Sequence, residues 1–165
     1  MNITFAPRGI LQIDDARLVF RNFAGAGSKF NREGDRNFAI VIPDQETADA
    51  LIAEGWNVKI KPPRDPQDDP FMYLTVKVKF NDRGPKCYLS CGDAPARELI
   101  PSDDPEDDMV GILDEIDIRS VDLDVRPYDW EVNGKEGRTA YLQSIHVTQE
   151  IDRFSAKFNN ESTPY

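Results

Sequence analysis

Near the middle of the chain, ten residues read Phe71-Met72-Tyr73-Leu74-Thr75-Val76-Lys77-Val78-Lys79-Phe80. Every second side chain from Met72 to Phe80 is apolar, and the residues between them are aromatic, hydroxyl-bearing or cationic. Because successive side chains of a β-strand point to opposite faces, this alternation predicts a strand with one buried and one outward face. We expect the outward face to carry Phe71, Tyr73, Thr75, Lys77 and Lys79.

Similar alternation recurs along the chain, which we interpret as mostly β. Further strands are predicted over Ala16–Phe23, Asn37–Ile42, Trp56–Lys61, Lys86–Ser90, Asp114–Tyr128 and Arg138–Ile151. One segment predicts a short helix, with Asp44 as its N-cap, apolar residues on one face and Gly55 at its end. A single helix among so many strands favours a small antiparallel barrel or sandwich over a parallel sheet with crossover helices.

Turn-forming residues divide the chain further. Asn133-Gly134 and Asn81–Gly84 each lie between two alternating runs, which predicts two β-hairpins. The connecting loops are a glycine-containing segment, a proline-rich segment and an acidic segment, over residues 25–36, 62–70 and 101–108. We predict one domain over residues 1–155, followed by a flexible C-terminal tail over residues 156–165.

Length and composition exclude several classes of protein. The chain has 165 residues, of which 39% are hydrophobic and 30% charged, enough for one domain with a packed core. It lacks an apolar run that could cross a membrane, and its first residues lack the pattern of a secretory leader, so we expect a cytoplasmic protein. Cys87 and Cys91 are too few for a disulfide scaffold and are expected to be buried, and a lone His146 excludes a multi-histidine metal centre.

Motifs typical of enzymes are missing as well. Gly25-Ala26-Gly27-Ser28-Lys29 lacks the spacing of a phosphate-binding loop, and the chain has no nucleophile elbow. The acids of residues 103–108 lack the spacing of a calcium loop, so we interpret them as a solvated, flexible loop without a metal. We expect no catalytic residue and no cofactor.

The outward face of Phe71–Phe80 has the residue types that hold single-stranded nucleic acid. Aromatic rings stack on bases, and the lysines beside them neutralise phosphates. Other predicted strands and the glycine-containing loop supply similar groups. The candidate binding residues are Arg21, Phe23, Lys29, Arg32, Arg36, Lys59, Lys61, Phe71, Tyr73, Lys77, Lys79, Lys86 and Tyr88. Lysine alternating with valine is also typical of an ordinary solvated sheet face, and the aromatic residues around Asn133-Gly134 fit hairpin packing as well as base stacking.

The charges are unevenly distributed along the chain. The net charge is −10, yet residues 1–90 hold 13 Lys and Arg against 12 Asp and Glu, a net +1. Residues 91–165 hold 7 Lys and Arg against 18 Asp and Glu, a net −11. Because the cations concentrate in the first half, the acidic total does not exclude a nucleic-acid partner.

Four stretches follow one another along the chain and carry a resemblance to a known family. They are Phe20-Arg21-Asn22-Phe23, Asn37–Pro43 with the following helix, Phe71–Phe80 and Gly137–Ile145. In this order of elements the sequence resembles phage-encoded single-stranded DNA-binding proteins of the oligonucleotide/oligosaccharide-binding (OB) class. The resemblance implies an OB-like antiparallel β-barrel with one short helix and additional strands or hairpins.

The resemblance also implies a function. Such proteins coat and protect single-stranded DNA in phage replication and recombination, without a cofactor or bond-breaking chemistry. It implies replication or recombination proteins of the phage or host as further partners, which an acidic C-terminal tail ending in an aromatic residue recruits. Here Tyr165 ends the chain after Pro164, but Glu161 is the only acid of the tail.

Other interpretations are open at this stage. The acidic half could imitate a phosphate backbone, which would make the protein a protein-binding inhibitor of a host nucleic-acid enzyme. A structural phage component and a metal-dependent enzyme are weaker alternatives. The sequence patterns do not distinguish DNA from RNA as the nucleic acid bound. They also do not distinguish a barrel from a sandwich, or a monomer from a homo-oligomer.

Overall fold

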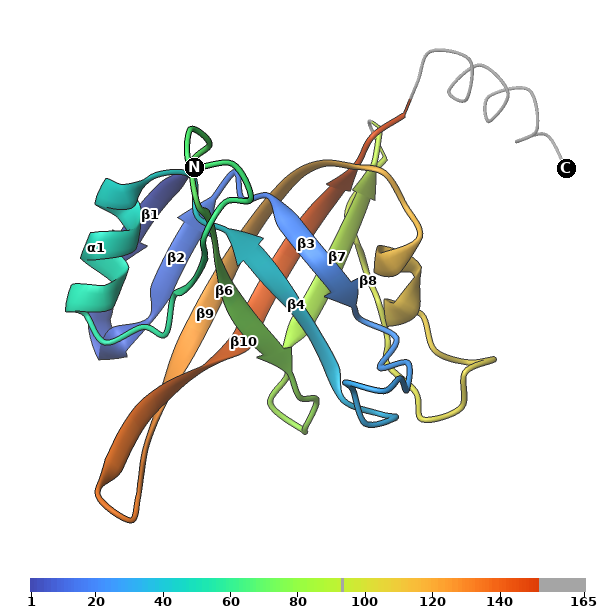
Figure 1. Cartoon of the computed structure of the whole chain (residues 1–165). Coiled ribbons are helices and arrows are strands. Elements are labelled where there is room, and N and C mark those ends of the chain that lie inside the picture. The colour runs from blue at the N-terminus through green and yellow to red at the C-terminus, as the bar shows by residue number, and fades with distance from the viewer. Residues whose placement is uncertain (93, 152–165) are drawn as a thin grey trace, which may run out of the picture.

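A computed structural model describes residues 1–92 and 94–151 of the chain. The tail predicted over residues 156–165 lies outside the described residues. The described chain forms one ten-stranded sheet, an α-helix and two short 3₁₀ helices (Figure 1). In chain order the elements are β1 (Asn2–Phe5), η1 (Pro7–Gly9), β2 (Leu11–Asp14), β3 (Leu18–Asn22), β4 (Arg36–Val41), α1 (Gln45–Ala53), β5 (Lys59–Lys61), β6 (Phe71–Val78), β7 (Lys86–Cys91), β8 (Arg97–Glu98), η2 (Val110–Asp114), β9 (Ile118–Val132) and β10 (Lys135–Gln149).

The sheet follows the order β1-β2-β9-β10-β6-β4-β3, with β5 paired to β6 and β7 paired to β10 and β8. The mostly-β class with one α-helix is therefore confirmed. The strands are not all antiparallel, because both β6 and β7 run parallel to β10. Within the described residues the hydrogen-bonded path is open, since no pairing joins β1 to β3, so closure into a barrel stays a prediction.

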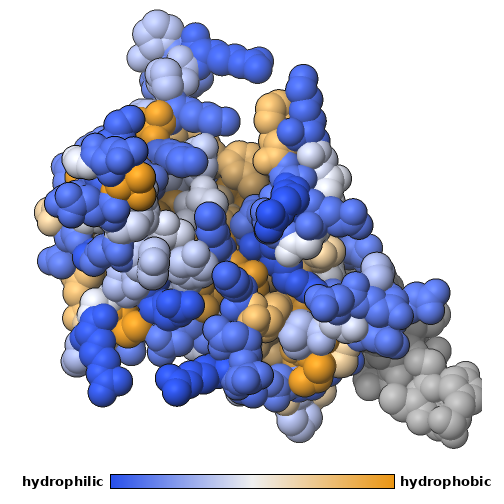
Figure 2. Space-filling view, turned by 90° about the horizontal axis from the view of Figure 1, so that it is seen from below, coloured by the Kyte–Doolittle hydropathy of each residue, from blue (hydrophilic) through white to orange (hydrophobic). Residues whose placement is uncertain are grey.

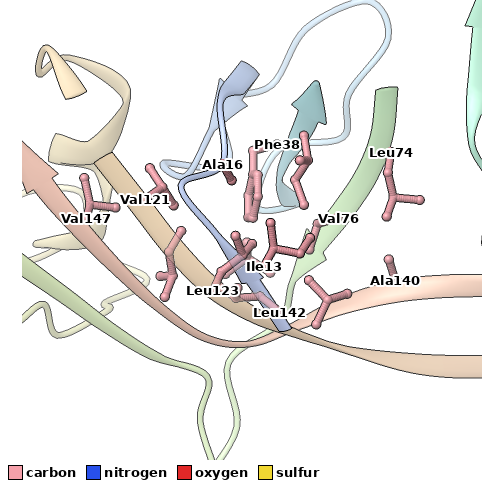
Figure 3. Close-up of a cluster of buried hydrophobic side chains, with 14 of the residues drawn as sticks. Ile13, Ala16, Phe38, Leu74, Val76, Val121, Leu123, Ala140, Leu142 and Val147 are labelled. Carbon is pink, nitrogen blue, oxygen red and sulfur yellow. The ribbon is translucent and has the colours of Figure 1, made fainter. Parts of the chain in front are cut away.

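The buried face of β6 confirms the predicted alternation. Met72, Leu74, Val76 and Val78 all lie in the core. They meet buried side chains from β2, β4, β9 and β10, several of which are seen together in Figure 3. Because that face is fully covered, the side chains of the opposite parity are fixed on the outer surface of the sheet.

The helix and one hairpin form where the sequence predicts them. The Asp44 carboxylate accepts a hydrogen bond of 2.7 Å from the backbone N–H of Thr47, and the helix covers the core with Ala48 and Leu51. Ile52, which the helical spacing also places on this apolar face, is exposed. Asn133 and Gly134 both have positive φ, as the tight turn between β9 and β10 requires. These two strands continue beyond the rest of the sheet as a projecting arm (Figure 1).

The second predicted hairpin is wrong. Although Asn81 and Gly84 form a small bridge of their own, β6 and β7 do not pair with each other. Instead they follow one another along the same edge of β10, with Val76 opposite Ala140 and Lys86 opposite Ser144. The turn therefore passes the chain from one parallel pairing to the next.

Several other boundaries differ from the sequence-based expectation. Only Lys59–Lys61 of the predicted Trp56–Lys61 strand pairs in the sheet; Trp56 is buried, whereas Ile60, expected in the core, is exposed. The start of the predicted Asp114–Tyr128 strand belongs to η2 instead. The short strands β1, β2 and β8 were not predicted. Among the described residues, no helix has the length and apolar character needed to span a membrane.

Candidate nucleic-acid interface

Three aromatic rings form a cluster on the outer face of the sheet. Phe71 and Tyr73 of β6 stack with ring centroids 5.5 Å apart, and Phe20 of β3 meets them edge-on at 6.0 and 5.5 Å. Phe20 is 58% exposed, and the other two rings are half-buried. We call Phe20, Phe71 and Tyr73 the aromatic cluster. Its rings support one another while offering open surface to a ligand.

A backbone irregularity places Phe20 in this cluster. Strict alternation puts Phe20 on the core face and Phe23 outside, but the register of β3 against β4 shifts between Val19 and Asn22. Phe20 itself has φ of 51°, which is uncommon for a residue with a side chain. The shift turns Phe20 outward and sends Phe23 into the core, where it stacks on Phe38 at 4.8 Å. Phe23 is therefore removed from the candidate stacking residues, because its ring is fully buried.

Two predicted lysines border the aromatic cluster. Strand β5 pairs with β6 so that Lys59 lies opposite Tyr73 and Lys61 opposite Phe71. The Lys61 ammonium is 5.7 Å from the Phe20 ring centroid and 5.8 Å from that of Tyr73. Both lysines are exposed. A phosphate beside a stacked base would therefore meet a cation at this end of the sheet.

A groove of about 870 Å³ lies beside the second half of β6. Its lining residues come from β4, β6 and β10, from the loops that precede β4 and follow β6, and from the acidic loop: Asn31, Arg32, Gly34, Asp35, Arg36, Asn37, Thr75, Lys77, Val78, Lys79, Phe80, Pro101, Ser102, Asp103 and Tyr141. Thr75 is two residues from Tyr73 on the same face of β6. The groove lining therefore begins two residues from the aromatic cluster on the outer face of β6.

The groove is cationic along β6 and bordered by acids elsewhere. Lys77, Lys79 and Arg32 are exposed, whereas Asp35 and Asp103 come from the bordering loops. Asp35 lies 3.5 Å from Arg32 in a solvent-exposed pair, a kind of contact that contributes little. The predicted lysines Lys77 and Lys79 are therefore the cations best placed for a phosphate chain.

Arg36 has a different role from the predicted one. Its guanidinium forms a bidentate ion pair with the Asp108 carboxylate, with N–O distances of 3.0 and 3.2 Å. It also donates hydrogen bonds to the backbone oxygens of Phe23 and Ser102. The side chains of the pair are only 12% and 8% exposed. Arg36 thus joins the glycine-containing loop to the acidic loop and builds the wall of the groove.

Asp108 shows that the acidic loop is not simply solvated. Its carboxylate accepts hydrogen bonds of 3.0 Å from the backbone N–H groups of Ser102 and Gly111 in addition to those from Arg36. Burial opposes ionisation of this group, but the hydrogen bonds from Arg36 and the two N–H groups, together with the Arg36 charge, outweigh burial and lower the pKa of Asp108. The loop is held by this carboxylate, whereas Asp103, Asp104, Glu106 and Asp107 face solvent.

The remaining predicted residues lie apart from the aromatic cluster or serve the fold. Arg21 donates 2.7 and 2.8 Å hydrogen bonds to the backbone oxygens of Leu113 and Ile116 and so fixes η2. Lys86 pairs with Glu98 at 3.0 Å. Tyr88 is half-buried on β7, opposite His146, and Lys29 is exposed in the glycine-containing loop with its ammonium over the neighbouring Phe30 ring.

The described residues contain no group of three or more potential metal ligands. Burial raises the pKa of the Cys87 thiol to about 12, so this cysteine stays protonated and packs as a small apolar side chain, as predicted. Cys91, which was also predicted to be buried, is only half-buried. The end of the molecule that carries the loops around the groove is mostly hydrophilic, with apolar groups only in small separate patches (Figure 2).

Comparisons with known proteins bear on the fold. The structure is similar to the C-terminally truncated single-stranded DNA-binding protein from bacteriophage Enc34, with a TM-score of 0.55, 11% identity and 92% of each chain covered. It is also similar to that protein solved in complex with single-stranded DNA, with a TM-score of 0.53, 10% identity and 93% of each chain covered. No curated protein sequence matches the chain. At such identities the likeness defines the class of fold, that of phage single-stranded DNA-binding proteins.

The family follows from the sequence itself. Residues 3–163, nearly the whole chain, match the model of the family described as "Putative phage ssDNA-binding domain". The protein belongs to this family, and the predicted resemblance is confirmed.

Proposed function

We propose that the aromatic cluster and the groove together bind single-stranded DNA. The observation that carries this proposal is the outward face of β6, on which two rings of the aromatic cluster are followed by Thr75, Lys77 and Lys79 of the groove lining. Bases stack on the rings, and phosphates lie against Lys59, Lys61 and the groove lysines. Each stacked base contributes about 1–3 kcal/mol.

The surface favours single strands because stacking on a side chain needs an unpaired base. In a duplex the faces of the bases are covered by their neighbours, so the aromatic cluster gains nothing from it. We infer that the protein is non-enzymatic and uses no cofactor. It coats and protects single-stranded DNA during phage replication and recombination, and we expect it to act in the host cytoplasm.

A direct test is fluorescence anisotropy with labelled oligo-dT and a matched duplex, at low and at moderate salt. We expect tight binding to the single strand, weak binding to the duplex, and a steep loss of affinity with salt because phosphate contacts release counterions. Equal binding of both DNA forms would contradict the stacking mechanism. No binding at low salt would reject the proposal and favour the acidic, protein-binding interpretation.

Replacing Lys77 with alanine should flatten the salt dependence of binding. Loss of one phosphate contact reduces the slope of log affinity against log salt by about 0.7 for single-stranded DNA. The slope is measured by anisotropy over a salt series. Arg119→Ala is the matched control, because it removes an exposed cation near the start of β9, away from the groove lining. An unchanged slope in Lys77→Ala would place the phosphate chain elsewhere.

A further inference from the structure

We propose a second base-stacking subsite at the root of the projecting arm, formed by Tyr128, Tyr141 and Arg126. This arm subsite rests on the proposed function and extends it. The DNA strand would run from the aromatic cluster through the groove and across β10 onto β9. None of these three residues is among the predicted binding residues, although the sequence around the hairpin turn fits base stacking as well as hairpin packing.

The three side chains form a compact group. The rings of Tyr128 and Tyr141 meet edge-on with centroids 6.1 Å apart, and the Arg126 guanidinium carbon lies 4.8 Å from the Tyr141 centroid. Tyr128 is 55% exposed. A base can therefore stack on the open Tyr128 ring while the guanidinium meets the phosphate beside it.

Sheet register joins this group to the groove. Lys77 of β6 lies opposite Tyr141 of β10, and Tyr141 lies opposite Arg126 of β9. Paired residues of neighbouring strands share one face of the sheet, so Lys77, Tyr141 and Arg126 form a row across three strands. Tyr141 itself lines the groove. One end of the groove thus lies next to Tyr73, and the other reaches the arm subsite.

Hairpin packing alone does not account for this arrangement. A purely supporting aromatic pair would cover its rings, yet Tyr128 keeps more than half of its surface open. Three residues beyond Arg126 on β9, Asp129 neutralises Arg138 at 2.6 Å. Arg126 forms no ion pair within the described part of the chain, although several acids lie on the arm. Its charge is available for a phosphate.

The two stacking sites are too far apart to be filled by a very short strand. From Tyr73, the nearest ring of the aromatic cluster, to Lys77, which lies opposite Tyr141, the chain advances four residues, or about 13 Å at about 3.3 Å per residue. Crossing to β10 and β9 adds about two strand spacings of about 4.8 Å each. The arm subsite should therefore contribute to long oligonucleotides and not to short ones.

The test is the length dependence of binding for Tyr141→Leu, which keeps apolar volume but removes the aromatic ring, and for the more exposed Tyr128→Ala. Anisotropy is measured with oligo-dT from about 4 to about 16 nucleotides, the range of site sizes for such folds. We expect both variants to match the unaltered protein on the shortest strand and to bind the longest strand about 5-fold more weakly or worse. Phe5→Ala is the control, because it removes an exposed ring from β1.

Equal affinity at every length in both variants would overturn the arm subsite, and so would an equal loss at every length. Failure of the proposed function gives a different result, since the unaltered protein itself would then not bind. Photocrosslinking supplies a second measurement, with 5-iododeoxyuridine placed in turn along the longest strand. Crosslinks to Tyr141 or Tyr128 should arise from one end of the strand and crosslinks to Tyr73 from the other. Crosslinks to both sites from the same position would contradict the path.

Discussion

Replacing Phe71 and Tyr73 together with alanine is expected to weaken binding to oligo-dT by about 2–6 kcal/mol, a factor of about 30 or more. The two rings stack on each other at 5.5 Å and carry Phe20 against their edges, so removing both abolishes the aromatic cluster. The loss should persist at high salt because stacking, unlike phosphate contact, does not depend on counterion release. Anisotropy titrations at two salt concentrations measure both effects.

The fold should survive this double substitution, since both rings lie on the outer face and the core face of β6 is untouched. Circular dichroism and thermal unfolding would verify this. Tyr73→Phe, which keeps the ring, should bind nearly as well as the unaltered protein, and Phe5→Ala serves as the exposed-ring control here too. If the double variant bound oligo-dT with unchanged affinity, the DNA would have to lie on another face.

The outward face of β6 could be predicted from sequence because strand alternation is a local property. Phe71, Tyr73 and Lys77 lie where period-two alternation places them, and the helix N-cap at Asp44 follows from equally local chemistry. That these residues contact DNA stays a prediction.

Strict alternation places Phe20 on the wrong face because alternation holds only while the register is continuous. The irregularity between Val19 and Asn22 reverses the parity of everything after it, so Phe20 and Phe23 exchange places. The arginine in the same stretch, Arg21, turns inward onto the backbone of η2, about 90 residues away in sequence. Local patterns carry no information about such a distant partner.

The same limit explains the turn at Asn81–Gly84 and the omission of Tyr141. A tight turn between two strands predicts that they pair with each other. Here β6 and β7 instead pair one after the other with the same edge of β10. That parallel pairing brings Tyr141 beside Lys77 although 64 positions separate them in the sequence. Because β6 pairs with β10, the rings and lysines on the outer face of β6 lie on the same surface as side chains of β10 and β9.

Replacing Asp108 with alanine is expected to lower the free energy of unfolding by about 3–5 kcal/mol. The substitution leaves the Arg36 guanidinium, only 12% exposed, without its carboxylate, and it frees the backbone N–H groups of Ser102 and Gly111. Urea unfolding measures the change. Asp107→Ala removes an exposed acid from the same loop and should alter stability by less than about 0.5 kcal/mol.

The pH dependence of this effect identifies its source. Because the folded protein lowers the pKa of Asp108 from the ordinary carboxyl value of 3.8, the unfolded chain takes up the proton first as the pH falls. The stabilisation is complete above that ordinary value and disappears as the pH drops through the lower, folded-state pKa. The stability difference between the unaltered protein and Asp108→Asn should therefore shrink below about pH 4. A difference that stayed constant throughout acid titration would mean that packing of the loop, rather than the charge on Asp108, holds the groove wall against Arg36.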